Sequence, residues 1–206
     1  LIQRTNHLND LLVNLDDKLI KKIINNGIKV NNIFLPSLIS TNIKLQKKLI
    51  EIEKQRPLSF GHGDLCFNNI LVEPNSISIK LIDPKAIIYK NEVGIVPYQY
   101  DLAKLNHSFR CLYDSIICNM YSLNYNKDNF SLKIFTPRRY SFIIETFTKV
   151  FFSSSKALSE INILTANLFL SMLPLHCEDP KRVLALALIG NLVYEKSKNF
   201  NSDFFS

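Results

Sequence analysis

The stretch that decides the fold is Phe60-Gly61-His62-Gly63-Asp64-Leu65-Cys66-Phe67-Asn68-Asn69-Ile70-Leu71-Val72, which is followed at a short distance by Leu81-Ile82-Asp83-Pro84. Between the two lies Glu73-Pro74-Asn75-Ser76, whose residue types are typical of a turn. The apolar Ile77, Ile79 and Leu81 then alternate with the polar Ser78 and Lys80, which indicates a strand. The sequence therefore predicts a β-hairpin.

The hairpin determines which polar residues meet. Because its two strands run out and back, we expect Asn69 and Asp83 to lie at the same end, with Asp64 one short loop away. Two carboxylates and a carboxamide then converge. Phosphoryl transfer needs such a set, since one carboxylate orients the attacking hydroxyl while another, with an amide oxygen, holds Mg²⁺ against the nucleotide phosphates.

Each of these residues also has an ordinary structural explanation. Asp64 can be a turn residue, Asn69 part of a loop in an asparagine-rich chain, Asp83 the end of a strand, and Asp101 a helix cap. Taken singly, the structural explanation is the better one. Taken together, in this order and spacing, the residues favour a kinase-like site.

With these residues the chain resembles the aminoglycoside phosphotransferase and choline kinase family, which shares the protein-kinase fold. The family commonly has His-Gly-Asp-Leu-His-Pro-Gly-Asn-Ile-Leu and then Ile-Asp-Trp or Ile-Asp-Phe. This chain departs from that pattern at residues 66–68, and its Pro84-Lys85-Ala86 is similar to an Ile-Asp-Pro-Arg-Gly branch among bacterial capsular-polysaccharide and lipopolysaccharide biosynthesis proteins. Tyr100-Asp101-Leu102-Ala103 resembles the family's Asp-Leu-Ala segment, so the likeness covers residues 58–105.

The resemblance implies a role for each residue of the motif. Asp64 would be the catalytic base, and Asn69 and Asp83 would bind Mg²⁺, with ATP as co-substrate. His62 would hold the loop, and Asp101 would brace it. The implied activity is phosphorylation of a hydroxyl on a small molecule, a sugar or amino-alcohol of the kind used in capsule or surface-polysaccharide biosynthesis; the alternative is a non-catalytic kinase-like binding module.

Residues for the acceptor substrate are only weakly indicated. His176, Glu178 and Asp179 offer polar groups, and Tyr98, Tyr100, Tyr113 and Tyr121 offer aromatic surface, although core packing is the better explanation for these tyrosines.

The remaining pattern predicts an α+β, mainly helical unit, the C-terminal lobe of a protein-kinase-like fold with a small catalytic β-hairpin. Residues 60–86 would form its catalytic and metal loops and residues 101–200 its helical substrate side. Apolar spacing and capping residues predict helices over 7–26, from Ser40 or Thr41 to 52, 101–113, 136–152, 159–173 and 180–198, with a polar loop over 124–129. In the helix over 136–152 we expect a buried set consisting of Phe142, Ile143, Phe147, Val150 and Phe151.

One half of a kinase is missing from the pattern. Residues 1–61 have helical periodicity and contain no Val-Ala-x-Lys strand, and the glycines suit no phosphate-covering loop. We therefore expect the N-terminal nucleotide lobe to be absent from this chain and the isolated chain to be inactive.

Composition excludes several other classes of protein. The net charge of +7 is dispersed in pairs of basic residues, which argues against nucleic-acid binding, and no run approaches eighteen apolar residues, which argues against membrane insertion. The four cysteines form no Cys-x-x-Cys pair, so we expect reduced thiols in a cytoplasmic protein.

Overall fold

The computed structural model describes residues 18–54, 57–85, 94–126 and 129–198. The described chain is α+β and mainly helical, as predicted. Its helices are α3 (Lys18–Asn25), α4 (Leu38–Glu53), α5 (Tyr98–Phe109), α6 (Tyr113–Ile117), α7 (Tyr140–Phe151), α8 (Ser155–Met172) and α9 (Pro180–Ser197), with short 3₁₀ turns η1 (Phe67–Asn69) and η2 (Leu173–His176). Its strands are β1 (Ile28–Val30), β2 (Ile33–Leu35), β3 (Leu58–Phe60), β4 (Ile70–Glu73), β5 (Ser78–Leu81), β6 (Ile95–Pro97), β7 (Tyr121–Asn126) and β8 (Asn129–Ile134).

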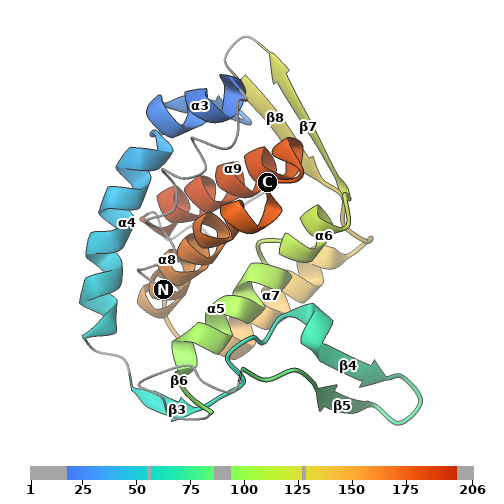
Figure 1. Ribbon diagram of the computed structural model, residues 1–206. Coiled ribbons are helices and arrows are strands. Elements are labelled where there is room, and N and C mark those ends of the chain that lie inside the picture. Colours follow the sequence, from blue (N-terminus) through green and yellow to red (C-terminus); the bar gives the residue numbers. More distant parts are fainter. Residues whose placement is uncertain (1–17, 55–56, 86–93, 127–128, 199–206) are drawn as a thin grey trace.

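The core is built around α8 and α9. These two helices pack against each other, and α4 and α5 pack against α8 on its other sides (Figure 1). Residues 161–170 of α8 and 183–194 of α9 are buried without interruption, so neither helix has a solvent-facing stripe over that length. A helix that is apolar all round belongs in the centre of a fold.

One stretch is long and apolar enough by composition to cross a membrane. It is Ser155–His176, which comprises α8 and η2, and 67% of its most apolar window is buried among the other described elements. The packing of α8 against α5 and α9 accounts for this composition, as in the core helix of a soluble protein.

A four-stranded sheet with the order β2-β1-β8-β7 covers one end of the helices. The polar loop predicted over 124–129 is wrong, because residues 124–126 belong to β7 and Asn129 begins β8. The prediction failed because asparagines are typical of loops, and Asn124, Asn126 and Asn129 lie in these strands. The residues that follow have the period-two pattern of a strand, with Phe130 and Leu132 buried and Ser131 and Lys133 exposed. Strand β1 pairs in parallel with β8, a contact that local sequence pattern does not reveal.

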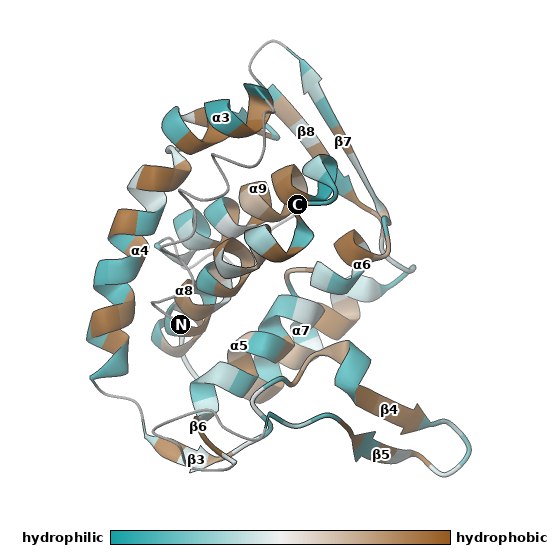
Figure 2. Ribbon diagram, viewed as in Figure 1, coloured by the Kyte–Doolittle hydropathy of each residue, from teal (hydrophilic) through white to brown (hydrophobic). Residues whose placement is uncertain are grey.

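The predicted hairpin is confirmed. Strands β4 and β5 pair antiparallel with Ile70 opposite Leu81 and Glu73 opposite Ser78, and they project from the helical body (Figure 1). Both strands carry exposed apolar side chains, which colour much of the hairpin brown in Figure 2. A separate pair, β3 with β6, joins the start of the motif to the chain that enters α5.

Two helix boundaries are predicted correctly, the start of α9 and the end of α3. Asp179 caps α9 through a bond from the amide of Arg182, and α3 ends at the asparagines as expected, although residues 7–17 of that predicted helix lie outside the described residues. Three other predicted helix starts are wrong. Ser37 caps α4 instead of Ser40 or Thr41, and Ser154 caps α8, which therefore begins before the predicted residue 159. Pro97 precedes α5, so Asp101 lies inside the first turn of that helix and does not cap it. Helix α5 ends at Phe109, and α7 begins only at Tyr140, after Arg139 in a left-handed conformation.

The predicted buried set on α7 is largely wrong. Only Phe147 is buried, at 4% exposed, whereas Phe142 and Val150 are 68% and 69% exposed and Ile143 and Phe151 are also exposed. Sequence periodicity shows that α7 has an apolar face, but it does not show whether another element of the chain covers that face.

A buried polar cluster holds α5 to α8. The Asn106 amide donates to Asn162 Oδ1 (3.2 Å) and Thr165 Oγ1 (2.8 Å), and Arg110 donates to the side-chain oxygens of Asn106 (3.0 Å) and Asn162 (3.2 Å). Because polar groups inside a fold are costly to leave without partners, these bonds fix one relative position of the two helices.

His107 is buried on the same helix between the rings of Tyr113 and Phe169, with centroids 4.2 and 4.1 Å away. Among the described residues neither ring nitrogen has a hydrogen-bond partner. Burial, together with the charges of Lys104 and His176, holds the pKa of His107 well below its ordinary value, so the native imidazole is neutral.

We predict that His107 makes the protein less stable in mild acid. The unfolded histidine takes up a proton as the pH falls below about 6.5, whereas the native one does not, so the free energy of unfolding falls as the pH falls through that value. His107→Phe keeps an aromatic ring in this position and should flatten the profile between pH about 6.5 and 5. Urea denaturation across that range measures the effect; an equal slope in the variant and the wild type would contradict it.

Candidate active site

The loop over Gly61–Asp64 is held by the side chain of Asp101. One carboxylate oxygen of Asp101 accepts the amide of His62 (2.7 Å) and the other accepts the amide of Gly63 (2.8 Å). A Cβ at Gly61 would lie 2.2 Å from Val96 and 2.7 Å from Asp101, and Gly63 has φ +77°, a conformation that favours glycine. The two glycines therefore allow the loop to approach α5 closely enough for this contact.

His62 joins the two loops of the motif. Its Nε2 lies 2.9 Å from the carbonyl oxygen of Ile82, and its Nδ1 lies 3.3 Å from the amide of Asp64. A carbonyl can only accept and an amide can only donate, so Nε2 is the donor and Nδ1 the acceptor in these two contacts. The backbone repeats the connection, since the amide of Lys85 donates to the carbonyl of His62. These are the contacts that a loop-holding residue needs.

Asn69 and the segment at Asp83 meet at the open end of the hairpin. The amide of Ile82 donates to the carbonyl of Asn69 (3.0 Å), one residue beyond the first paired position of the strands. The side chain of Asn69 is buried and its Nδ2 donates to the carbonyl of Asp64 (2.8 Å). Asp83 is exposed and has φ +57°. The loop containing Asp64 is thus tied to the hairpin by Asn69 and to α5 by Asp101.

The carboxylate of Asp64 lies between two lysines. Lys104 Nζ is 2.8 Å from Oδ1, and Lys85 Nζ is 3.9 Å from Oδ2. Burial by itself raises the pKa of Asp64, but the hydrogen bond and charge of Lys104, followed by the charge of Lys85, outweigh burial and lower that pKa. Burial would lower the pKa of Lys104, yet Tyr100 and Asp64 raise it. Both groups are therefore ionised at neutral pH.

Lys104 contacts Asp64 but was not among the residues predicted from the sequence for the candidate site. It stands three positions after Asp101 on α5, and residues with this spacing share one helix face. Asp101 contacts the loop backbone from this face and Lys104 contacts the Asp64 side chain. The spacing was available as a signal, but a lysine in a basic chain is ordinarily an exposed residue, and this one is 9% exposed.

The weakly predicted substrate residues lie around the start of α9. His176 Nε2 is 3.4 Å from the Tyr113 hydroxyl, while Glu178 and Asp179 are both paired with Arg182. Burial, then the charges of Asp114, Cys66 and Asp64, raise the pKa of Tyr113. His176 therefore contacts Tyr113 of α6, whereas Glu178 and Asp179 pair with Arg182 at the start of α9.

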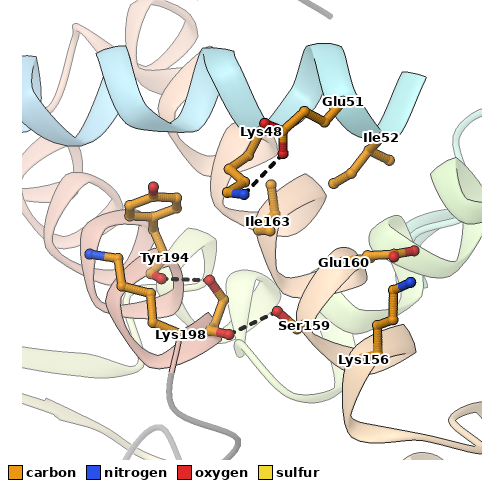
Figure 3. A pocket seen from close by; sticks show the side chains of 10 residues that line it. Lys48, Glu51, Ile52, Lys156, Ser159, Glu160, Ile163, Tyr194 and Lys198 are labelled. Carbon is orange, nitrogen blue, oxygen red and sulfur yellow. Dashed lines mark hydrogen bonds and ion pairs between the residues drawn. The ribbon is translucent and has the colours of Figure 1, made fainter. Parts of the chain in front are cut away.

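A hollow of about 380 Å³ lies elsewhere, between α4, α8 and α9 (Figure 3). It is lined by Lys48, Glu51 and Tyr194 among others, and it includes none of the predicted site residues. Lys48 is paired with Glu51, and Ser159 donates to the carbonyl of Ser197, as the dashed lines in Figure 3 mark. Some of its polar groups are thus paired with one another, and Lys198 pairs with Glu195 beside the hollow.

The protein donors around the hairpin suit Mg²⁺ better than a transition metal. Among the described residues no three His, Cys, Asp or Glu side chains come close enough to form a metal site. Magnesium commonly takes only one or two protein oxygens and completes its shell with water and phosphate. Since the nitrogen of the Asn69 amide is bonded to Asp64, its oxygen is left for a cation, and Asp83 adds an exposed carboxylate. These are the two oxygen donors that the described residues would offer to such an ion.

Comparisons of the chain with protein-family models, with curated proteins and with solved structures find no match.

We predict that Lys104→Met raises the pKa of Asp64 above its wild-type value, because burial remains when the favourable charge is gone. In the wild type the lowered pKa stabilises the fold above the pKa of the unfolded carboxyl, about 3.9, and this stability is lost as the pH falls through the lower folded value. Carbon-detected NMR titration of Asp64 measures the shift. Lys85→Met is the matched control and should have a smaller effect, since its ion pair is longer and more exposed. Equal shifts in both variants would contradict the assignment.

Proposed function

We propose that this chain forms part of an ATP- and Mg²⁺-dependent phosphotransferase that acts on a hydroxyl of a small molecule. The observation that carries the proposal is the loop centred on Asp64, which is joined to the base of the hairpin at Asn69 and Ile82 and held on α5 by Asp101. A carboxylate, an amide and a second carboxylate thus belong to one connected unit of structure.

Asp64 suits the role of orienting an acceptor hydroxyl. Its side chain is 25% exposed, so a substrate can reach it, and its lowered pKa keeps it ionised. Such a carboxylate is a weak base. Phosphoryl transfer tolerates that, because its loose transition state needs positioning and charge neutralisation more than strong proton abstraction.

Asn69 and Asp83 would hold the magnesium ion, which in this class of reaction neutralises charge on the phosphates of ATP. Lys104 and Lys85 add two positive charges beside Asp64. These lysines favour the approach of an anionic co-substrate and oppose its electrostatic repulsion by the carboxylates.

The cover over the nucleotide would come from polypeptide other than the residues described. The described ranges contain no glycine-rich phosphate loop and no strand with the Val-Ala-x-Lys pattern that a kinase uses for its phosphate-binding lysine. The exposed apolar side chains of the hairpin, such as Leu71, Val72 and Ile79, offer a surface for a second lobe. We place the protein in the cytoplasm, where ATP and reduced thiols are available; the four cysteines are free.

A non-catalytic kinase-like binding module is the second candidate. The observation that favours it is the Asp64–Lys104 ion pair, at 2.8 Å, which occupies one oxygen of the carboxylate that would have to contact the acceptor. A module of this kind would bind nucleotide or sugar without turnover.

We predict different defects at the two ends of the motif. In the longest natural form of the protein, Asp64→Asn should lower kcat by roughly 100-fold or more while Mg²⁺-ATP binding survives, because the residue acts on the acceptor. Asp83→Ala should instead weaken Mg²⁺-ATP binding, since it deletes a charged ligand of a hard cation. Asn69→Ala should do so less strongly. Mass-spectrometric detection of phosphorylated sugars and alcohols, with calorimetric titration of Mg²⁺-ATP, measures both.

Asn68→Ala is the matched control, because Asn68 is the exposed neighbour of Asn69. Near-normal turnover by Asp64→Asn would remove that residue from the acceptor role. Wild-type Mg²⁺-ATP affinity in Asp83→Ala would refute the metal assignment, and binding without any product in the wild type would support the binding module.

A further inference from the structure

Helix α7 presents an apolar face that no described residue covers. It lies along α5, with Phe147 stacked on Phe109 at 4.8 Å (Figure 1). Phe142 and Val150, eight residues apart on α7, are 68% and 69% exposed. Exposing two such large side chains on one helix is costly in water, and in a folded protein an exposed apolar face of this kind marks a contact surface.

The face is hollowed as well as apolar. A groove of about 270 Å³ runs along it, lined by Phe109, Phe142, Ile143, Thr146, Phe147, Val150 and Phe151. The only polar side chain among these is Thr146. Since the helix backbone is already hydrogen-bonded within α7, the groove offers almost nothing that an extended peptide backbone could bond. It suits hydrocarbon, which needs no hydrogen-bond partner.

Basic residues precede α7 and also occur on it. Arg138 and Arg139 are exposed directly before α7, and Lys133 lies over the exposed ring of Phe135, 5.9 Å from its centroid. Lys149 is exposed on the helix itself, beside the one acidic residue of the segment, Glu145. From Lys133 to Phe151 the chain therefore carries four basic residues and one acidic residue, a net charge of +3 out of +7 for the whole chain.

This charge decides between two occupants. A second copy of the chain packed on the same face about a two-fold axis would bring two positively charged segments together, which is unfavourable. A surface of anionic lipid would be attracted by the same charges while its acyl region received the apolar side chains. An amphipathic helix with aromatic residues on one face and basic residues at its border is the usual form of an interfacial lipid-binding helix.

We propose that α7 and the preceding Arg138–Arg139 segment dock this protein on an anionic lipid surface, with Phe142, Val150 and Phe151 entering the headgroup boundary. The chain lies on the membrane and does not span it. A line of ring contacts leads from this face to the candidate active site: Phe151 to Phe147 (4.9 Å), Phe147 to Phe109 (4.8 Å) and Phe109 to Phe67 in η1 (4.5 Å). The loop of Asp64 therefore lies close to the docked surface.

Vesicle co-sedimentation tests the proposal with the wild-type chain. We expect binding to vesicles of phosphatidylcholine with phosphatidylglycerol, little binding to phosphatidylcholine alone, and loss of binding as salt is raised. Phe142→Ser combined with Val150→Ser should weaken binding by about tenfold or more, and Arg138→Glu combined with Arg139→Glu by a similar factor.

Two control variants make equal changes elsewhere. Val72→Ser with Ile79→Ser alters a cross-strand pair on the exposed hairpin, and Lys44→Glu with Lys47→Glu reverses two exposed charges on α4. Both should bind as the wild type does. Equal loss in the controls, or binding that ignores lipid charge, overturns the proposal.

Sedimentation velocity without lipid tests the other occupant. A dimer that the Phe142→Ser and Val150→Ser variant abolishes would assign the face to self-association and overturn lipid docking; we expect a monomer. Because every readout is binding or mass, these results are independent of whether the chain transfers phosphate.

Discussion

The two hydrogen bonds that the Asp101 carboxylate accepts from the backbone amides of His62 and Gly63 are the contacts on which the rest of the candidate site depends. They attach a loop with little secondary structure of its own to the first turn of α5. Helix α5 is in turn fixed on the core helix α8 by the buried bonds of Asn106 and Arg110. Two sets of polar contacts therefore fix the position of Asp64 relative to the hydrophobic core. A change in the packing of α8 would therefore move α5 and, through Asp101, the loop. The loop can approach Asp101 this closely because Gly61 has no side chain.

The charges of Asp64, Lys104 and Lys85 also depend on this arrangement of the loop on α5. Asp64 alone would bring a negative charge to the place where polyanionic phosphates must approach. With Lys104 and Lys85 beside it, the three side chains together carry a positive charge, and the loop becomes compatible with an anionic ligand. The ion pair also holds Asp64 in one orientation before a substrate arrives, so less ordering remains to be done on binding. Preorganisation and charge balance thus come from one residue, Lys104, on the helix that also braces the loop.

The sequence predicts those parts of the structure that are set by neighbouring residues. The hairpin follows from turn residues flanked by alternating apolar positions, and the start of α9 follows from Asp179 and Pro180, because both signals act within a few residues. The meeting of Asn69 with the Asp83 segment follows from the hairpin. The pairing of β1 with β8 could not be predicted, because it joins segments far apart in the chain. The pairing of Lys104 with Asp64 was missed for another reason: the spacing from Asp101 indicates the shared helix face, but not that a lysine on it is buried. The apolar residues of α7 are recognised as a face, but whether the face is covered depends on all the other elements together.

The parallel pairing of β1 with β8 has a consequence for how the protein is made. Asn31 bonds the backbone of Leu132 in both directions across 101 positions of sequence, so the sheet that closes one end of the helices cannot form until its last strands have left the ribosome. At a synthesis rate of about 5–20 residues per second, β1 and β2 wait for roughly 5–20 seconds with their edges unpaired. During that interval an exposed two-stranded ribbon is open to pairing with other chains. The yield of correctly folded protein should therefore be sensitive to the speed of translation through the middle of the message and to chaperones that shield strand edges.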